Sequence, residues 1–162
     1  MADNGQANID KLRAQALKLL ARREHSRTEL ALKLQRRQWQ LSQIEQVLDD
    51  FEERNWLNDQ RFAEIFARQR RERGYGPLRI KADLHQRGIY RVPAPSEEEG
   101  PIDWIGIATN ALERRFGSQA GPDSEPDRNL WLKRARFLAQ RGFESDQISE
   151  AIDRYTRQQE EC

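Results

Sequence analysis

The chain has 162 residues, with 28 basic and 27 acidic side chains, so its formal net charge of +1 selects no class of partner. Charged residues make up 34% and the hydrophobic set only 36%, which argues against a large compact core. No apolar run is long enough to cross a bilayer, and the single cysteine, Cys162, can form no internal disulfide.

Three helices are predicted in residues 1–57. Eight polar residues, expected to fray, precede an apolar stripe that runs through residues 9–20 at helical spacing. Ser26 and Glu29 have the spacing of a capping box, which predicts the start of a second, short helix. Ser42 and Glu45 have the same spacing and predict a third helix. Its inward face is the quartet Ile44, Val47, Leu48 and Phe51.

A pair of helices joined by a glycine corner is predicted in residues 58–89. Asn58 or Asp59 can accept hydrogen bonds from the first amides of the pair. Gly74 is expected to end the first helix and Pro77 to begin the second, where no N–H is needed. Gly88 is expected to close the pair with a left-handed turn. The inward residues would include Phe62, Ile65, Phe66, Ile80 and Leu84.

This helix pair has a strongly basic outer surface. Residues 61–91 contain nine basic and three acidic side chains, a net charge of +6. Arginine dominates, and its planar fork matches the paired oxygens of phosphates and carboxylates. The candidate residues for binding a partner or nucleic acid are Arg68, Arg70, Arg71, Arg73, Tyr75, Arg79, Lys81 and Arg87.

The next segment departs from a helical pattern. Residues 92–101 contain three prolines and three consecutive glutamates, so a buried helix there is shortened or irregular, and the glutamates are expected to be solvated. Asp103 is expected to cap a further helix. Residues 117–127 read as a second loose stretch.

The chain contains a hidden repeat. A shift of 50 residues places Leu34 on Leu84, and a further 54 residues reaches Leu138; each lies near a helix end and has a large apolar residue beyond the turn. The summed shift of 104 also places the apolar quartet of residues 44–51 on Ile148, Ala151, Ile152 and Tyr155. The sequence therefore predicts an all-α chain of three tandem three-helix repeats in an elongated, curved array. The expected repeats are residues 1–57, 58–101 and 102–162.

The pattern of charge is periodic as well. Residues 11–40, 61–91 and 128–142 have net charges of +7, +6 and +5, and acidic stretches follow each of them. The plain explanation is a set of solvated faces held by weak salt bridges. Recurrence at the same place in three repeats favours a binding surface instead.

Three runs at the centre of the chain resemble the signature of the RecX regulatory proteins. They are residues 57–63 (LNDQRFA), 74–80 (GYGPLRI) and 84–89 (LHQRGI), and the likeness extends over most of residues 12–155. The resemblance implies a protein that lies in the groove of the filament of RecA, the bacterial recombinase, and limits its extension, ATP hydrolysis and strand exchange. The expected partners are the RecA filament and single- and double-stranded DNA, with no membrane. A monomer in the cytoplasm is expected.

Two other classes of function stay open. A tandem helix-turn-helix protein would place the last helix of each repeat in the major groove, but those helices are acidic, so phosphates would repel them. A structural adaptor would make no contact with nucleic acid. An enzyme has little support, because the sequence has no phosphate-binding glycine loop and no nucleophile elbow. Neither a cofactor nor a metal site is predicted. The tryptophans are assigned to core packing rather than base stacking: Trp39, Trp56, Trp104 and Trp131.

Overall fold

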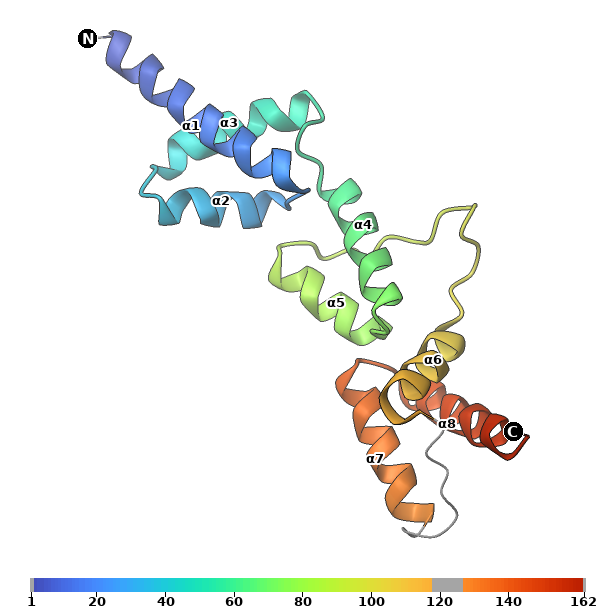
Figure 1. Cartoon of the computed structure of the whole chain (residues 1–162). Coiled ribbons are helices and arrows are strands. Elements are labelled where there is room, and N and C mark those ends of the chain that lie inside the picture. Colours follow the sequence, from blue (N-terminus) through green and yellow to red (C-terminus); the bar gives the residue numbers. More distant parts are fainter. Residues whose placement is uncertain (1, 118–126, 162) are drawn as a thin grey trace. The chain divides into compact units, whose positions relative to one another are not determined.

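The computed structural model describes residues 2–117 and 127–161, and this part of the chain contains eight α-helices and no strand (Figure 1). The all-α prediction is confirmed. The helices are α1 (Ala2–Arg22), α2 (Arg27–Arg36), α3 (Leu41–Glu53), α4 (Asp59–Glu72), α5 (Pro77–Gln86), α6 (Trp104–Phe116), α7 (Asp127–Gln140) and α8 (Ser145–Glu160). Cys162 and most of the second predicted loose stretch lie outside the described residues.

The chain forms two compact units. The first comprises Met1–Ile65 and Leu84–Pro93, and the second comprises Phe66–Asp83 and Ala94–Cys162. Helices α4 and α5 therefore contribute residues to both units. Each unit is described by itself below.

The core of the first unit lies between α1, α2 and α3. The predicted quartet of α3 is fully buried there, together with Leu12, Ala16, Leu30 and Leu34. The Ser26–Glu29 capping box is present as predicted. The second predicted box is wrong, because α3 begins earlier, at Leu41, and its N-cap residue Gln40 makes no side-chain hydrogen bond. Helix α1 also begins earlier than predicted, so residues 2–8 are helical rather than frayed.

The start of α4 and the end of α5 pack on the turn between α1 and α2 within the first unit. Asn58 caps α4, since its Oδ1 accepts the amide of Arg61 at 2.9 Å. The Asp59 carboxylate instead accepts the amide of Arg27 at 2.8 Å, and the Arg61 side chain pairs with Glu24 at 2.6 Å. These contacts attach the first turn of α4 to a segment more than thirty residues earlier in the chain.

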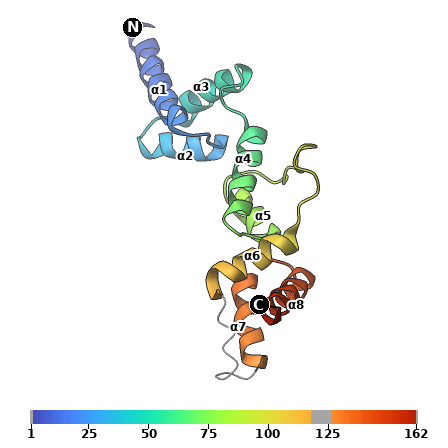
Figure 2. The same ribbon diagram turned by 45° about the vertical axis from the view of Figure 1, so that its right-hand side comes forward.

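In the second unit, α6, α7 and α8 enclose a core that includes the aligned residues Ile148, Ala151, Ile152 and Tyr155 (Figure 2). Asp103 caps α6 as predicted. The corner between α4 and α5 packs on the turn between α7 and α8. The amide of Gly76 donates to the carbonyl of Arg141 at 2.7 Å, and the amide of Leu78 donates to the carbonyl of Gly142 at 2.9 Å.

The repeat is visible in the backbone. Three helices end in a left-handed residue at the aligned positions Gln38, Gly88 and Gly142, with φ of 70°, 75° and 89°. In each, the next residue donates to the carbonyl of the aligned leucine, Leu34, Leu84 or Leu138, as in a Schellman turn. All three leucines are fully buried. The predicted alignment is therefore also a structural one.

The middle repeat contains two helices. Residues 92–101 form no helix, so an irregular segment stands where the other two repeats have their third helix. The assignment of tryptophans to the core holds for Trp39 and Trp104, which pack against the two cores. It is wrong for Trp56 and Trp131, which are 43% and 41% exposed. Trp56 still touches the core with one side of its ring, since its centroid lies 5.6 Å from that of Phe51.

Candidate functional site

Tyr75 lies at the centre of an arginine cluster in the second unit. Its ring lies beneath the guanidinium groups of Arg141, Arg70 and Arg79, at 4.6, 5.3 and 5.6 Å from the ring centroid. These are cation–π distances, and they keep the ring half-buried. The corner thus orders guanidinium groups from α4, α5 and the end of α7 around one aromatic side chain.

Two of the predicted site residues pair with the irregular segment. Arg68 Nε donates to Glu99 at 2.6 Å, and Arg71 lies 3.6 Å from the same carboxylate. The hydrogen bond from Arg68 and the amide of Ser96 lower the pKa of Glu99. Glu99 is exposed, as the sequence predicted, but the segment turns its carboxylate toward α4, where it pairs with both arginines.

Two further arginines share Asp83, which is 8% exposed. Arg79 donates to Asp83 at 3.3 Å across one turn of α5, and Arg70 approaches it from α4 at 3.8 Å. Arg70 also lies over the ring of Phe66 at 4.8 Å, so its head is largely covered. Because both guanidinium groups already lie against a buried carboxylate, removing either from it would leave a buried charge with one partner fewer.

The head groups that face solvent are fewer than the sequence suggested. In the second unit, Arg73 and Lys81 are exposed, and the side chains of Arg68 and Arg79 are about half exposed, at 52% and 47%. We call Arg68, Arg73, Arg79 and Lys81 the exposed cationic surface. The remaining predicted residues, Arg70, Arg71, Tyr75 and Arg87, are half-buried.

Arg87 belongs to the first unit. Its Nε lies 3.5 Å from Glu29, which also pairs with Arg23 at 3.1 Å. Burial alone would raise the pKa of Glu29, but the hydrogen bonds from Arg23 and from the amide of Ser26 lower it. The structure thus brings the predicted residues of α4 and α5 together in one unit, except for Arg87, which it assigns to the α1–α2 turn.

Sequence reasoning missed Arg141, Arg114 and Arg115. Arg141 occupies the position that the 54-residue shift aligns with Arg87, so the repeat itself could have indicated it. Arg114 and Arg115 are the only basic residues in the acidic stretch of residues 92–127. Two adjacent positive charges in an otherwise acidic stretch are the signal that could have indicated them.

The described residues offer little support for a metal site or a membrane-spanning helix. Among the described residues, no group of three or more His, Cys, Asp or Glu side chains could hold a metal ion. No helix in the same part of the chain has the length and apolar character that a membrane span needs.

Comparisons with known proteins agree with the repeat. The first three-helix domain of RecX matches residues 13–51, the second matches residues 58–91 and the third matches residues 106–152. The "Regulatory protein RecX" of Halorhodospira halophila is 44% identical over 152 residues, which cover 93% of this chain and 91% of that protein. The protein of the same name from Chromohalobacter salexigens is 40% identical over 141 residues, covering 86% and 90%.

The fold has solved counterparts. The crystal structure of RecX from Lactobacillus salivarius covers 96% of this chain and 99% of its own, with a TM-score of 0.74 and 23% sequence identity. At that identity the likeness concerns the fold. The matches of all three domain models, together with relatives above 30% identity along most of both chains, show that this chain belongs to the RecX family.

Proposed function

We propose that this chain is a cytoplasmic regulatory protein that binds the RecA–DNA filament and limits its extension, ATP hydrolysis and strand exchange. The observation that supports this most is the exposed cationic surface at the α4–α5 corner of a RecX-family chain. Exposed arginine and lysine heads can meet carboxylates of a protein filament or phosphates of its DNA, and Arg68 and Arg79 would exchange their partners Glu99 and Asp83 for the new ligand.

The repeat supports the same proposal. Basic residues recur in the first two helices of each repeat, so one chain offers several weakly binding groups. Groups that bind weakly alone gain affinity when a partner presents matching groups at fixed spacing. A filament of identical subunits is such a partner, whereas a free subunit offers the match only once.

A tandem helix-turn-helix protein that reads DNA is the second candidate, and one observation weighs against it. Asp49 and Glu52 of α3 lie on the outer side of the first unit, where both pair with Arg27, at 2.8 and 3.1 Å. A helix with exposed carboxylates entering the major groove would meet phosphates of the same sign. Contact with DNA is therefore proposed through the basic residues and the nucleic-acid backbone, with single- or double-stranded DNA as the ligand.

Co-sedimentation of the purified chain with RecA tests the proposal. Samples contain RecA alone, RecA with DNA, and RecA with DNA and a non-hydrolysable nucleotide that holds the filament together. We expect the chain to sediment with assembled filaments and, in a parallel assay with ATP in place of that nucleotide, to lower their rate of ATP hydrolysis. A chain that stays in the supernatant with every sample, at low salt, would contradict the proposal.

A further inference from the structure

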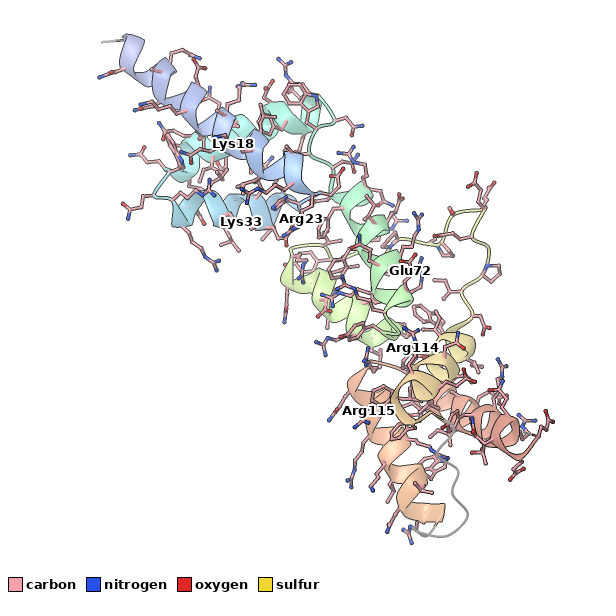
Figure 3. All side chains as sticks on the ribbon, in the orientation of Figure 1. Lys18, Arg23, Lys33, Glu72, Arg114 and Arg115 are labelled. Carbon is pink, nitrogen blue, oxygen red and sulfur yellow. The ribbon has the colours of Figure 1, made fainter. Side chains whose placement is uncertain are left out.

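A hollow in the second unit is lined by four arginines. The end of α4, the second half of α6 and the end of α7 enclose a space of about 150 Å³. Figure 3 labels Arg114 and Arg115 of α6 and Glu72 of α4. The residues that line the hollow are Arg73, Ala111, Arg114, Arg115, Phe137 and Arg141.

Neutral groups hold two of these arginines in place. Arg141 Nη1 donates to the carbonyl of Arg73 at 3.0 Å, and its guanidinium lies over the rings of Tyr75 and Phe137, at 4.6 and 5.2 Å. Arg114 Nη1 donates to the carbonyl of Glu72 at 3.4 Å. Backbone carbonyls and aromatic rings orient a guanidinium without cancelling its charge. The positive charge at the hollow therefore persists.

In the rest of the arginine cluster, by contrast, the guanidinium groups are paired with carboxylates. Arg68 and Arg71 share Glu99, and Arg79 and Arg70 share Asp83. The described lining of the hollow contains no carboxylate. Four like charges in a small space repel one another, and an anionic ligand would remove that repulsion.

Small residues let the end of α4 lie close to α6. A Cβ on Gly74 would come within 3.3 Å of the Cβ of Ala111 and 3.8 Å of Nη2 of Arg114. Gly74 has a φ of 82°, a conformation that glycine adopts without strain. The turn that ends α4 thus lies close to Ala111, a lining residue of the hollow, and brings the carbonyl of Glu72 to Arg114.

We propose that this hollow binds phosphate groups of a single-stranded nucleic acid. The inference rests on the proposed contact of this chain with filament DNA and assigns a specific site to it. Arginine forks match phosphate oxygens in pairs, and adjacent phosphates of one strand can engage forks that come from three helices. A single protein carboxylate can satisfy only a small part of this donor set.

Binding of fluorescent oligothymidylate to the isolated full-length chain tests the site. The test variant is Arg114→Gln with Arg115→Gln; both side chains are exposed, so helix content measured by circular dichroism should not change. The matched control, Arg128→Gln with Arg136→Gln, removes the same charge from exposed positions of α7 that do not line the hollow. A third variant, Arg114→Lys with Arg115→Lys, keeps the charge and removes the fork.

We expect the test variant to lose about tenfold or more in affinity and the control to lose less than about threefold at the same salt. The log–log salt dependence should flatten by about 0.7 for each phosphate that the variant no longer neutralises. The lysine variant should bind with intermediate affinity. Equal losses in the test and control variants would overturn the proposal, because the arginines would then act only through net charge.

Competition experiments identify the source of the anion. Displacement of the labelled strand by a base-free deoxyribose phosphate strand, by ATP or by inorganic phosphate supports a phosphate site, and the order of potency separates a strand from a free nucleotide. Displacement by oligoaspartate alone would overturn it in favour of a site for protein acids. RecA is absent from these experiments, so failure here leaves the co-sedimentation test of the proposed function unaffected.

Discussion

At the scale of single residues, the environment of each arginine decides what it can bind. Arg70 and Arg79 lie against Tyr75 and Asp83, whereas Arg73 and Lys81 extend into solvent. A guanidinium that already has an acid partner gives up that partner before it meets another ligand. Binding is therefore expected to depend mainly on the exposed head groups, although all of these side chains have the same formal charge.

Leu84 should contribute more to stability than any charged residue on the outer side of α5. It is fully buried, so Leu84→Ala is expected to lower the free energy of unfolding by about 2–5 kcal/mol. Lys81→Ala, on the exposed side of the same helix, should change it by less than about 0.5 kcal/mol. Urea unfolding followed by circular dichroism measures both. Losses in the reverse order would show that the inner and outer faces are misassigned.

His25 should make stability depend on pH. It is 1% exposed, and its Nδ1 donates to the carbonyl of Arg23 at 3.0 Å while its Nε2 accepts from the Lys33 ammonium at 2.9 Å. Burial lowers the pKa of His25 below its ordinary 6.5, although the bond to Arg23 opposes the shift. The unfolded chain then takes up a proton first as pH falls, so the stabilisation is complete above about pH 6.5 and is lost below it.

The matching experiment compares the chain with its His25→Gln variant, which cannot titrate. The free energy of unfolding of the parent chain should fall between about pH 7.5 and pH 5.5, and that of the variant should stay nearly level. Carboxylates with lowered pKa, such as Glu29, act only at more acidic pH, so they do not obscure this window. Parallel curves for the two chains would show that His25 is not the group responsible.

At the scale of elements, the corner between α4 and α5 depends on two glycines that touch. A Cβ on Gly76 would lie 2.5 Å from the carbonyl carbon and oxygen of Gly142, which are backbone atoms that cannot turn aside. We expect Gly76→Ala to destabilise the second unit by about 1–3 kcal/mol. Gly5→Ala, in open space on α1, should leave stability unchanged or raise it by up to about 1 kcal/mol. Equal effects of the two substitutions in thermal unfolding would contradict the packing of the corner.

The irregular segment of residues 92–101 should restrain the cationic surface. Glu99→Gln removes the carboxylate from Arg68 and Arg71, so both guanidinium groups become available to an anionic partner. Binding of single-stranded DNA should strengthen, and its log–log salt dependence should steepen by up to about 0.7 for each additional phosphate that is neutralised. Glu97→Gln, an exposed glutamate of the same segment, is the control. If both variants bind as the parent chain does, Glu99 does not restrain the surface.

The sequence predicted what depends on near neighbours and on the repeat. The burial of Leu34, Leu84 and Leu138 followed from periodicity, and the left-handed turn at Gly88 followed from its turn residue. The pairing of Arg68 with Glu99 could not be predicted, because the two residues are 31 positions apart and nothing local specifies which acid a given arginine meets. The same holds for Arg141, whose hydrogen bond to Arg73 depends on how two helix ends pack.

At the scale of the whole molecule, the three repeats have the same design but different surfaces. The third helix of the first repeat, α3, and that of the third repeat, α8, are buried along one face, and the middle repeat has the irregular segment instead. That replacement brings an acidic side chain to α4 where a regular helix would bring an apolar face. In the middle repeat, the irregular segment thus helps to set how much positive charge α4 exposes.

Inhibition of DNA-dependent ATP hydrolysis by RecA is the most direct test of the central claim that the exposed cationic surface binds the filament. The test variant combines Arg68→Gln, Arg73→Gln and Lys81→Gln; the control combines Lys11→Gln, Lys18→Gln and Arg22→Gln on α1, which are equally charged and exposed. We expect the half-inhibitory concentration of the test variant to rise about tenfold or more, since each exposed ion pair contributes up to about 1 kcal/mol. The control removes charge from the first repeat only, so it should need less than about three times more protein for half-inhibition than the parent chain. A folded test variant that inhibits at full strength would contradict the account.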